Sequence, residues 1–350
     1  MKAIYLYMGG PHHFHLSLVK KICKELNYDL VLVQRLPPPS LNPISELKLI
    51  YGLLKLPHAD VYFIEGLQGT FYLARWLRII DKNKKTINII AEPLIFLEDP
   101  PNVKWWLLKN VLIFKSLLKK ALNENSLNII VGGMYTEILT KEFKIKSYIE
   151  MPAGIEDNQY NALKEVKPNL KSNKIVIIAS LLSKDRVKWK GIDFAREVMD
   201  KVTKINPNLK LEVIGEYLPE IKKGYEAEYF KFLGFKKDLT LILKEYSLAL
   251  ALGYGDPFPV ASLETMLAGI PTITSNKIGT SKVAKIASKN LVVNYFDVQD
   301  ATTKILNYFR LSLKEKRELS SKVRKVAMEY KESKIIDKYI KSSTLQKFLK

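Results

Sequence analysis

Two acidic residues flank the start of a predicted helix in the stretch GYGDPFPVASLETMLAGIPTITS, which runs from 253 to 275. Pro259 suits the first turn of that helix, and Gly269 followed by Pro271 ends it. A helix start presents unpaired N–H groups and a partial positive charge, so it can hold an anion. Asp256 precedes the helix and Glu264 lies inside it, and both carboxylates could accept hydroxyl hydrogen bonds. A bound phosphate with two such acids beside it describes a nucleotide-sugar site.

The elements that must position these residues form two rounds of alternating strands and helices. Continuous apolar strands separated by helical stretches indicate a parallel sheet covered on both faces. The first round has predicted strands at 3–7, 29–34, 61–64, 87–91 and 127–131, with helices such as 14–26 and 71–80 between them. The second round has predicted strands at 174–180, 210–214, 248–252, 271–274 and 291–293. The predicted fold class is α/β, with two doubly wound domains whose ligand sites lie at the carboxyl ends of the strands.

The segment between the two rounds, MPAGIEDNQYNALKEVKPNLKSN, is polar and contains Pro152, Gly154 and Pro168. This composition is typical of a linker. We therefore expect an N-terminal domain at 1–155, a linker at 156–172 and a C-terminal domain at 173–330.

The composition fits two globular domains and an anionic partner. The chain has 350 residues, of which 47% are hydrophobic, enough for substantial cores. No apolar run reaches the roughly 18 residues needed to span a bilayer, and the start lacks the features of a signal peptide, so we expect a cytoplasmic protein. Cys23 is the only cysteine, which excludes an internal disulfide and a cysteine-based metal cluster.

The net charge of +20 favours phosphorylated small molecules or an acidic membrane surface, unless it reflects a lysine-rich proteome. The chain has no basic low-complexity tail and no zinc-finger or RNP-type signature. We therefore expect no nucleic-acid partner.

The stretch from Gly253 resembles the E-x7-E signature of the retaining GT4-type glycosyltransferases, which have the GT-B fold. Asp256 stands at the first acid of that signature and Glu264 at the second, with Gly269 and Pro271 in register. The runs MPAGIEDNQY, GMYTEIL and FLGFKKDLTLILKEYSLALALGY resemble further family motifs, so the resemblance covers nearly all of 125–285 and, more loosely, the first 100 residues. It implies two Rossmann-like domains facing a central cleft, and a terminal helix at 331–350 that crosses back onto the first domain.

The resemblance also implies a role for each site residue. Glu264 would bind the ribose hydroxyls, and Asp256 would lie near the donor sugar. Backbone groups of four consecutive residues would hold the sugar or the diphosphate: Phe258, Pro259, Val260 and Ala261. Lys190 matches the family's Lys-Gly pair and would neutralise the leaving diphosphate, so neither a metal ion nor another cofactor is expected.

The arginine that the family carries near this lysine is replaced here by Ser180. The loop from Ser180 to Lys190 is longer than in the family pattern and contains Lys184, Arg186 and Lys188. We expect Arg186 to supply the missing charge, although a solvated basic loop would show the same composition. One preorganised charge at a departing phosphate contributes about 3–4 kcal/mol to transition-state stabilisation.

Gly9 and Gly10 follow the first strand and stand where the family has a glycine loop close to the diphosphate and the acceptor. His12 lies on the same loop, and we expect it on the acceptor side rather than in a metal site, because three histidines within four positions rarely achieve tetrahedral ligation. Glu92 stands where many family members carry a histidine near the reacting centre. Glu92 could orient an acceptor hydroxyl, stabilise positive charge on the sugar, or be structural.

The segment 101–123 contains five lysines and no acid. At 100° per residue these lysines share one side of a helix and the apolar residues spread over the other. The pattern fits an ordinary domain helix, and it also fits peripheral docking at the inner face of the cell membrane on anionic lipid. Several relatives that glycosylate lipid-linked acceptors use such a helix in this domain.

These observations predict a glycosyltransferase that moves a sugar from a UDP- or GDP-linked donor to a glycan or lipid-phosphate-linked acceptor, with retention of configuration. Two alternatives stay open. A nucleotide-sugar epimerase of the GT-B fold would need no acceptor. A non-catalytic relative would bind a nucleotide sugar or a glycan without turnover.

Overall fold

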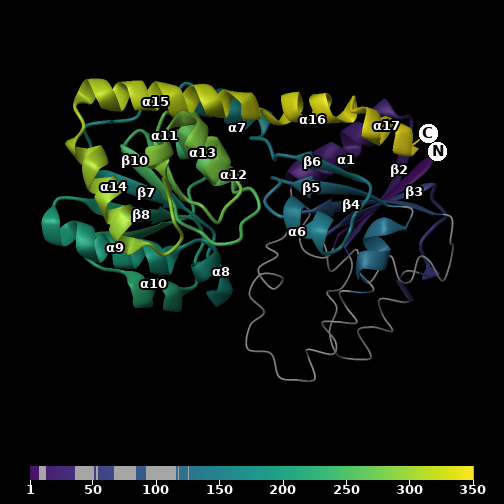
Figure 1. The fold of residues 1–350 in the computed structure, drawn as a ribbon, viewed down its shortest axis with the longest axis horizontal. Helices are drawn as coiled ribbons and strands as arrows, with labels where there is room; N and C mark the ends of the chain where they lie inside the picture. The colour runs from purple at the N-terminus through teal and green to yellow at the C-terminus, as the bar shows by residue number, and fades with distance from the viewer. Residues whose placement is uncertain are drawn as a thin grey trace. The chain divides into compact units, whose positions relative to one another are not determined.

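A computed structural model describes residues 1–7, 13–35, 51, 52, 54–66, 84–91, 116, 118–124 and 126–349. The chain divides into two compact units, and each contains its own six-stranded sheet (Figure 1). Unit 1 comprises Met1–Ala153 and Ser333–Lys350, and unit 2 comprises Gly154–Glu332. The last residues of the chain therefore belong to the unit in which the chain begins.

The sheet of unit 1 is parallel throughout, with the strand order β2-β1-β3-β4-β5-β6. Its strands are β1 (Lys2–Tyr7), β2 (Asp29–Arg35), β3 (Val61–Glu65), β4 (Lys85–Ile90), β5 (Ser126–Val131) and β6 (Tyr148–Met151). The central strands are almost wholly buried, as a sheet covered on both faces requires. The strand order reverses between β1 and β3, so a topological switch point lies at their carboxyl ends.

Four helices of unit 1 have described bounds: α1 (His13–Glu25), α6 (Thr136–Lys141), α16 (Glu332–Ile340) and α17 (Ser343–Leu349). Helix α1 buries residues spaced three and four apart, among them Phe14, Leu18 and Ile22. An ion pair of 3.2 Å between Lys21 Nζ and Asp337 Oδ1 joins α1 to α16. Unit 1 therefore holds the C-terminal helices by specific contacts.

The sheet of unit 2 is also parallel, with the order β12-β11-β10-β7-β8-β9. Its strands are β7 (Lys174–Ile178), β8 (Lys210–Ile214), β9 (Phe230–Gly234), β10 (Leu248–Ala251), β11 (Thr272–Ser275) and β12 (Val292–Val293). The chain winds outward from β7 in one direction and then from β10 in the other. The switch point of unit 2 therefore lies between β7 and β10.

Helices cover both faces of this sheet (Figure 1). One face carries α9 (Ile192–Ile205) and α14 (Val298–Arg310), which pack on each other, together with α10 (Pro219–Tyr225). The other face carries α11 (Leu239–Leu243), α12 (Val260–Leu267), α13 (Ser281–Ala287) and α15 (Leu313–Ala327). Two further helices are α7 (Asp157–Leu163), which contacts α11 and α12, and α8 (Lys184–Trp189). Unit 2 is thus doubly wound around a buried sheet.

The predicted α/β fold with two parallel sheets is confirmed, but the predictions missed β6 and β9. Both strands lie at an edge of their sheet, and in both the exposed and buried residues alternate instead of forming a continuous apolar run. The segment 156–172 forms α7 and turns within unit 2. The predicted helix 71–80 and most of 101–123 lie outside the described residues.

Candidate active site

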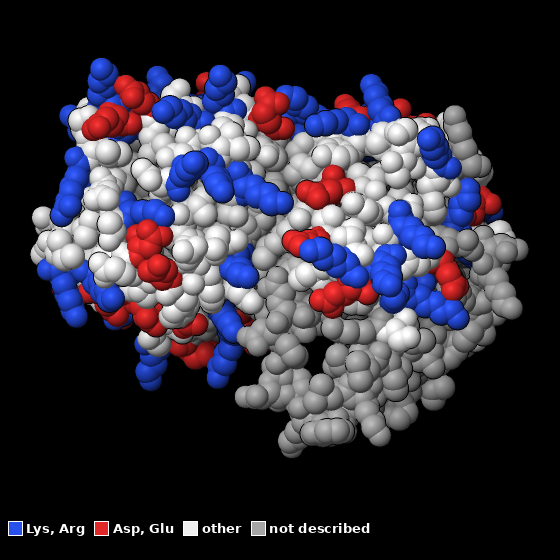
Figure 2. Space-filling model, viewed as in Figure 1, with Lys and Arg blue, Asp and Glu red and all other residues white. Residues whose placement is uncertain are grey.

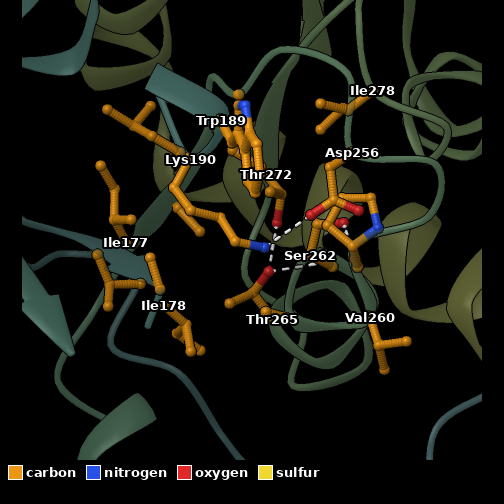
Figure 3. Close-up of a pocket in the computed structure, with 18 residues that line it drawn as sticks. Ile177, Ile178, Trp189, Lys190, Asp256, Val260, Ser262, Thr265, Thr272 and Ile278 are labelled. Atoms are coloured by element: carbon orange, nitrogen blue, oxygen red, sulfur yellow. Dashed lines mark hydrogen bonds and ion pairs between the residues drawn. The ribbon is translucent and has the colours of Figure 1, made fainter. Parts of the chain in front are cut away.

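A cavity opens in unit 2 at the carboxyl ends of β7 and β10, where doubly wound sheets bind ligands. Its floor is apolar and comes mainly from these two strands. The start of α12 and the turn after α8 complete the wall (Figure 3). Eighteen residues line it, among them the predicted site residues Lys190, Asp256, Pro259, Val260 and Ala261. The structure therefore brings five predicted site residues together at the switch point.

Lys190 and Asp256 form an ion pair across this cavity, with 2.7 Å between Lys190 Nζ and Asp256 Oδ2. Figure 3 shows the two side chains pointing toward one another. The lysine side chain is 29% exposed and the aspartate side chain 17%, so the pair is accessible but largely shielded from solvent. The other carboxylate oxygen, Oδ1, accepts a hydrogen bond from the backbone N–H of Phe258 at 3.3 Å. A fixed cation and a fixed acid thus face the same space.

Close backbone packing fixes the position of Lys190. It caps α8, and the next residue, Gly191, has a φ of +70°, in the left-handed region that favours glycine. A Cβ atom at Gly191 would lie 2.2 Å from the carbonyl oxygen of Leu252. The backbone N–H of Tyr254 donates to the carbonyl of Trp189 at 3.0 Å. The turn that carries Lys190 is therefore held against the loop that carries Asp256.

The loop of Asp256 is also held on its other side. The N–H of Gly255 donates to the carbonyl of Lys277 at 2.7 Å, and the N–H of Gly279 donates to the carbonyl of Asp256 at 3.0 Å. A Cβ atom at Gly279 would overlap the carbonyl oxygen of Pro257 at 1.6 Å, so only glycine fits there. Asp256 is presented by a loop that is bonded to both neighbouring segments.

Helix α12 begins at the cavity without a side-chain cap. Pro259 is the N-cap residue, and no side chain accepts a hydrogen bond from the first turn. The sequence predicts Pro259 inside the first turn of the helix. In the structure Pro259 is the N-cap residue, and the helix begins one residue later, at Val260. Because a helix start leaves its first N–H groups without intrahelical partners, the backbone of Val260 and Ala261 can donate to an anion in the cavity.

Glu264 faces a second, adjacent hollow of ≈ 270 Å³. The two hollows share Ile178 at the end of β7. Burial raises the pKa of Glu264 to about 7. Within the described part of the chain, its carboxylate has neither an ion pair nor a hydrogen bond to a side chain. Asp256 therefore lies on the loop before α12 and Glu264 lies within α12, but the two carboxylates face different hollows.

The sequence analysis missed the other side of this second hollow. The loop after β9 supplies Phe235, Lys236 and Lys237, and α7 supplies Gln159. Phe235 is 68% exposed. The available signal in the sequence was Gly234, which ends β9 and in the structure has a φ of +75°, in the left-handed region that favours glycine. The missed edge strand β9 hid that signal.

Arg186 is the residue proposed for the missing family arginine, and its Nη1 donates to the backbone carbonyl of Ser180 at 3.3 Å. The guanidinium is therefore bonded to the backbone at position 180, and Arg186 is not among the residues that line either hollow. Arg186 stands on helix α8, so the expectation of a loop there is wrong: residues 184–189 are helical. Ser183 precedes this helix in an extended conformation, a favourable N-cap residue type.

Phe258 is 8% exposed and packs near Tyr330, with ring centroids 5.8 Å apart. It therefore stabilises the loop from the inside, and only its backbone can serve a ligand. Four other predicted site residues, Gly9, Gly10, His12 and Glu92, lie outside the described residues.

Unit 1 contains a polar cluster at its own switch point that the sequence analysis did not identify. Glu65 ends β3, and its carboxylate accepts hydrogen bonds from the Tyr5 hydroxyl and from His15, whose Nδ1 lies 2.9 Å from Oε1. Tyr5 and His15 are buried, and burial together with the Glu65 charge raises the pKa of Tyr5. An acid directly after four apolar strand residues was the available signal.

A metal-binding cluster and a membrane-spanning helix are both absent from the described residues. No three histidine, cysteine, aspartate or glutamate side chains there come together as a metal site would require. None of the helices in that part of the chain combines the length and the hydropathy needed to cross a membrane.

Comparison with known proteins agrees with this architecture. Residues 158–326 match the family described as Glycosyl transferases group 1. Sucrose-phosphate synthase from Thermosynechococcus elongatus is similar in structure, with a TM-score of 0.72 and 12% identity over 97% of both chains. HepE from Anabaena, solved in complex with UDP, has a TM-score of 0.70 and 16% identity over 99% of this chain and 100% of that chain.

A further similar structure is WaaG, a glycosyltransferase involved in lipopolysaccharide biosynthesis, with a TM-score of 0.70 and 13% identity over 97% of this chain and 98% of that chain. Curated proteins gave no match. The two parallel-sheet units define the GT-B fold, as predicted. Residues 158–326 match the model of the group 1 glycosyltransferases, and this match supports the assignment of the protein as a glycosyltransferase.

Proposed function

We propose that the protein transfers a sugar from a nucleoside-diphosphate sugar to a hydroxyl acceptor with retention of configuration. The observation that carries this proposal is the ion pair of Lys190 and Asp256 at the uncapped start of α12, beside a second hollow that contains Glu264. HepE was solved in complex with UDP and glucose and with UDP-glucose, which are ligands of that protein, and these support the donor class proposed here.

The two hollows divide the donor between them. The diphosphate lies at the start of α12, where Val260 and Ala261 donate backbone hydrogen bonds and Lys190 supplies a positive charge. The ribose hydroxyls reach Glu264, and the base occupies the hollow beside Phe235. Asp256 accepts hydrogen bonds from the donor sugar. Because Asp256 already holds Lys190, diphosphate binding adds a second anion to a preorganised cation instead of immobilising a free side chain.

The reaction exchanges one bond at the anomeric carbon for another. The bond from the anomeric carbon to the diphosphate oxygen breaks, and a bond to the acceptor oxygen forms on the same face of the sugar. The leaving phosphate oxygen takes the acceptor proton, so no side-chain base is needed. Lys190 and Arg186 stabilise the charge that develops on the diphosphate. The proposal needs no metal ion and no other cofactor, so chelation with EDTA is expected to leave the rate unchanged.

The proposed acceptor is a glycan or a lipid-phosphate-linked glycan. The supporting observations are the lysine-rich segment 101–123, together with the net charge of +20. With such an acceptor the protein would act from the cytoplasm at the inner face of the membrane.

The first test is stabilisation against heat by UDP, GDP and ADP and by their sugar conjugates, on the wild type and on Glu264→Ala. A ligand at 100 times its dissociation constant adds about 2.7 kcal/mol to the free energy of unfolding. We expect one nucleotide to stabilise the wild type and to have a weaker effect on the variant. If no nucleotide stabilises the wild type, the assigned donor site is wrong.

A turnover assay with the stabilising sugar nucleotide then separates the enzyme classes. Release of the nucleoside diphosphate that requires an added acceptor supports transfer. Epimerised product without acceptor, or binding without any product, would contradict it.

A further inference from the structure

Helices α13 and α15 of unit 2 pack on each other and, with Glu329 and Tyr330 after α15, line a hollow of ≈ 650 Å³ that shares no lining residue with the two donor hollows. Its lining includes Ile286 and Ala287 from α13 and Lys322, Lys325 and Val326 from α15. Figure 2 shows lysine and arginine side chains gathered on the face of unit 2 that carries these helices. The hollow combines apolar walls with a basic rim.

Ile286 is 71% exposed, more than any other large hydrophobic side chain in the described part of the chain. Helix α13 buries Val283 and Ala284, which face its neighbours. At 100° per residue, Ile286 lies about 60° from Val283 and about 160° from Ala284, and within about 100° of Lys282 and Lys285, so it stands at the edge of the buried side of α13 beside these lysines. Because most of its side chain is exposed, Ile286 adds little to the core of unit 2, and its apolar surface is available to a partner.

Five exposed lysines surround this isoleucine: Lys282, Lys285, Lys289, Lys322 and Lys325. Among the described residues, none of the five forms an ion pair. Elsewhere in unit 2, Lys174 and Lys304 lie within 2.7 and 2.8 Å of a carboxylate oxygen. The acids nearest in sequence to Lys322 and Lys325 are Glu318 on α15 and Glu329 two residues after its end, and only Glu329 lines the hollow. The patch therefore carries a net positive charge that side chains of the same unit do not neutralise.

We infer that this patch, defined as Lys282, Lys285, Ile286, Lys289, Lys322 and Lys325, docks unit 2 on the headgroups of an anionic phospholipid bilayer. Charge complementarity selects an anionic surface, and each lysine near such a surface strengthens binding about fivefold. The exposed isoleucine selects lipid over nucleic acid, because it can enter the interface between headgroups and acyl chains while the lysines stay with the phosphates. This inference is independent of the proposed sugar transfer and of the segment 101–123.

The test is co-sedimentation of the full-length protein with vesicles of phosphatidylcholine containing phosphatidylglycerol, and with vesicles of phosphatidylcholine alone. The patch variant is K282Q/K285Q/K322Q/K325Q. The matched control is K201Q/K204Q/K210Q/K231Q, which removes four exposed lysines elsewhere in unit 2. A second pair compares Ile286→Ser with Ile205→Ser, since Ile205 is 61% exposed on α9.

We expect the wild type to bind the anionic vesicles only. The patch variant should lose about a hundredfold or more in affinity, and the control variant much less. Ile286→Ser should weaken binding about tenfold while Ile205→Ser does not. Thermal melting and UDP binding should be the same for all variants, because none of these residues lines the donor hollows.

Three results would overturn the inference. Equal losses for the patch and control variants would mean that only the total charge matters. Wild-type binding by the patch variant would assign the membrane contact to another segment. Displacement from vesicles by inorganic phosphate or by single-stranded RNA, with no effect of Ile286→Ser, would identify a phosphate or nucleic-acid site instead.

Discussion

In the proposed donor site, Glu264 would serve a ligand at the expense of stability. A carboxylate that accepts hydrogen bonds from two ribose hydroxyls must be ionised, whereas burial raises the pKa of Glu264 to about 7 in the donor-free protein. Donor binding should therefore weaken as the pH falls. We predict that the dissociation constant of the donor nucleotide rises about tenfold from about pH 8 to about pH 6, measured by calorimetry. Glu264→Gln cannot titrate at position 264, so any pH dependence that this variant retains comes from the nucleotide itself. The tenfold rise in the dissociation constant should be absent from this variant.

The raised pKa of Glu264 has the opposite pH dependence for the stability of the folded protein. Its pKa in the folded protein exceeds its ordinary value of 4.5, so the folded state binds more protons than the unfolded state between about pH 4.5 and 7. The free energy of unfolding must then fall as the pH rises through this window. Glu264→Gln should be more stable than the wild type at about pH 8, by about 1–3 kcal/mol, and should lose this advantage near pH 4.5. A destabilised variant at pH 8 would show that the carboxylate is favourably paired.

Lys190 and Asp256 should separate nucleotide binding from sugar transfer. Lys190→Ala removes the cation at the leaving group and should lower kcat about 10²- to 10³-fold. Lys188→Ala, two residues earlier on exposed α8, is the control and should cost less than about threefold. Asp256→Asn frees Lys190 from its ion pair, so it should bind the nucleoside diphosphate at least as tightly as the wild type while transferring sugar more slowly. Weaker binding of the diphosphate to Asp256→Asn would contradict these roles.

The site residues that the sequence identified are those whose position follows from one strand, one loop and one helix. Asp256, Val260 and Ala261 meet at the cavity because β10, its loop and α12 are continuous in the chain. The hollow of Glu264 also needs the loop after β9, two strands away from β7 across the sheet. Residue spacing in the sequence does not show that this loop lies close to Glu264, because the order of the strands in the sheet decides which loops are neighbours. The spacing of Asp256 and Glu264 in the sequence therefore could not predict that the two acids face two different hollows.

At the scale of elements, one arginine of α15 holds three segments together. Arg324 Nη2 donates to the carbonyl of Ala268 at the end of α12, at 2.8 Å, and Arg324 Nη1 donates to the carbonyl of Lys164 after α7, at 2.6 Å. Nη2 also reaches the carbonyl of Val166 at 2.5 Å. Burial lowers the pKa of Arg324. This side chain therefore fixes the end of the helix whose start lines the candidate site.

Replacing Arg324 should test that role. Arg324→Ala leaves three backbone carbonyls without their donor, two of them in partly buried hydrogen bonds, and should lower the free energy of unfolding by about 2–4 kcal/mol. Arg317→Ala removes an exposed arginine from the same helix and should change it by less than about 0.5 kcal/mol. Denaturant unfolding of both variants measures the difference. Equal effects would mean that the hydrogen bonds of Arg324 are matched by water in its absence.

Elements were predictable from the sequence where burial was complete on both sides. The central strands of both sheets are mostly apolar and largely buried, and all of them were found. The edge strands β6 and β9 alternate between exposed and buried residues, so the same criterion overlooked them. Helix α8 is six residues long and buries only Val187, so its sequence is nearly all polar and reads as a loop. An alternating or mostly polar sequence, rather than an unusual conformation, accounts for these misses.

At the scale of the whole molecule, the chain passes between the units twice, and the two passages are paired on the side of unit 2. The N–H of Ile155 donates to the carbonyl of Tyr330 at 2.8 Å, and the N–H of Glu332 donates to the carbonyl of Ile155 at 2.9 Å. Composition indicated a boundary in this region through Pro152 and Gly154, but the return of the chain at 332 depends on tertiary pairing. The pairing binds the start of unit 2 to its end.

Gly154 makes this pairing possible. A Cβ atom at Gly154 would lie 2.5 Å from the Cα atom and 2.8 Å from the backbone nitrogen of Glu332, so the paired segments would have to separate. Gly154→Ala should therefore lower the free energy of unfolding by about 1–3 kcal/mol and lower Tm by several degrees. Gly224→Ala is the control, because a Cβ atom there has nothing within 4 Å and the residue lies in helix α10. It should raise stability by up to about 1 kcal/mol.

Limited proteolysis distinguishes a local from a general effect of Gly154→Ala. If the pairing holds the two passages together, the variant should be cleaved near 154 and 332 faster than the wild type, at a temperature where both remain folded, because local opening exposes the backbone to the protease. The control Gly224→Ala should keep the wild-type cleavage pattern. Unchanged cleavage at both passages, with a lowered Tm, would assign the effect of Gly154→Ala to the body of unit 2. The paired passages would then contribute no separate restraint where the chain enters and leaves that unit.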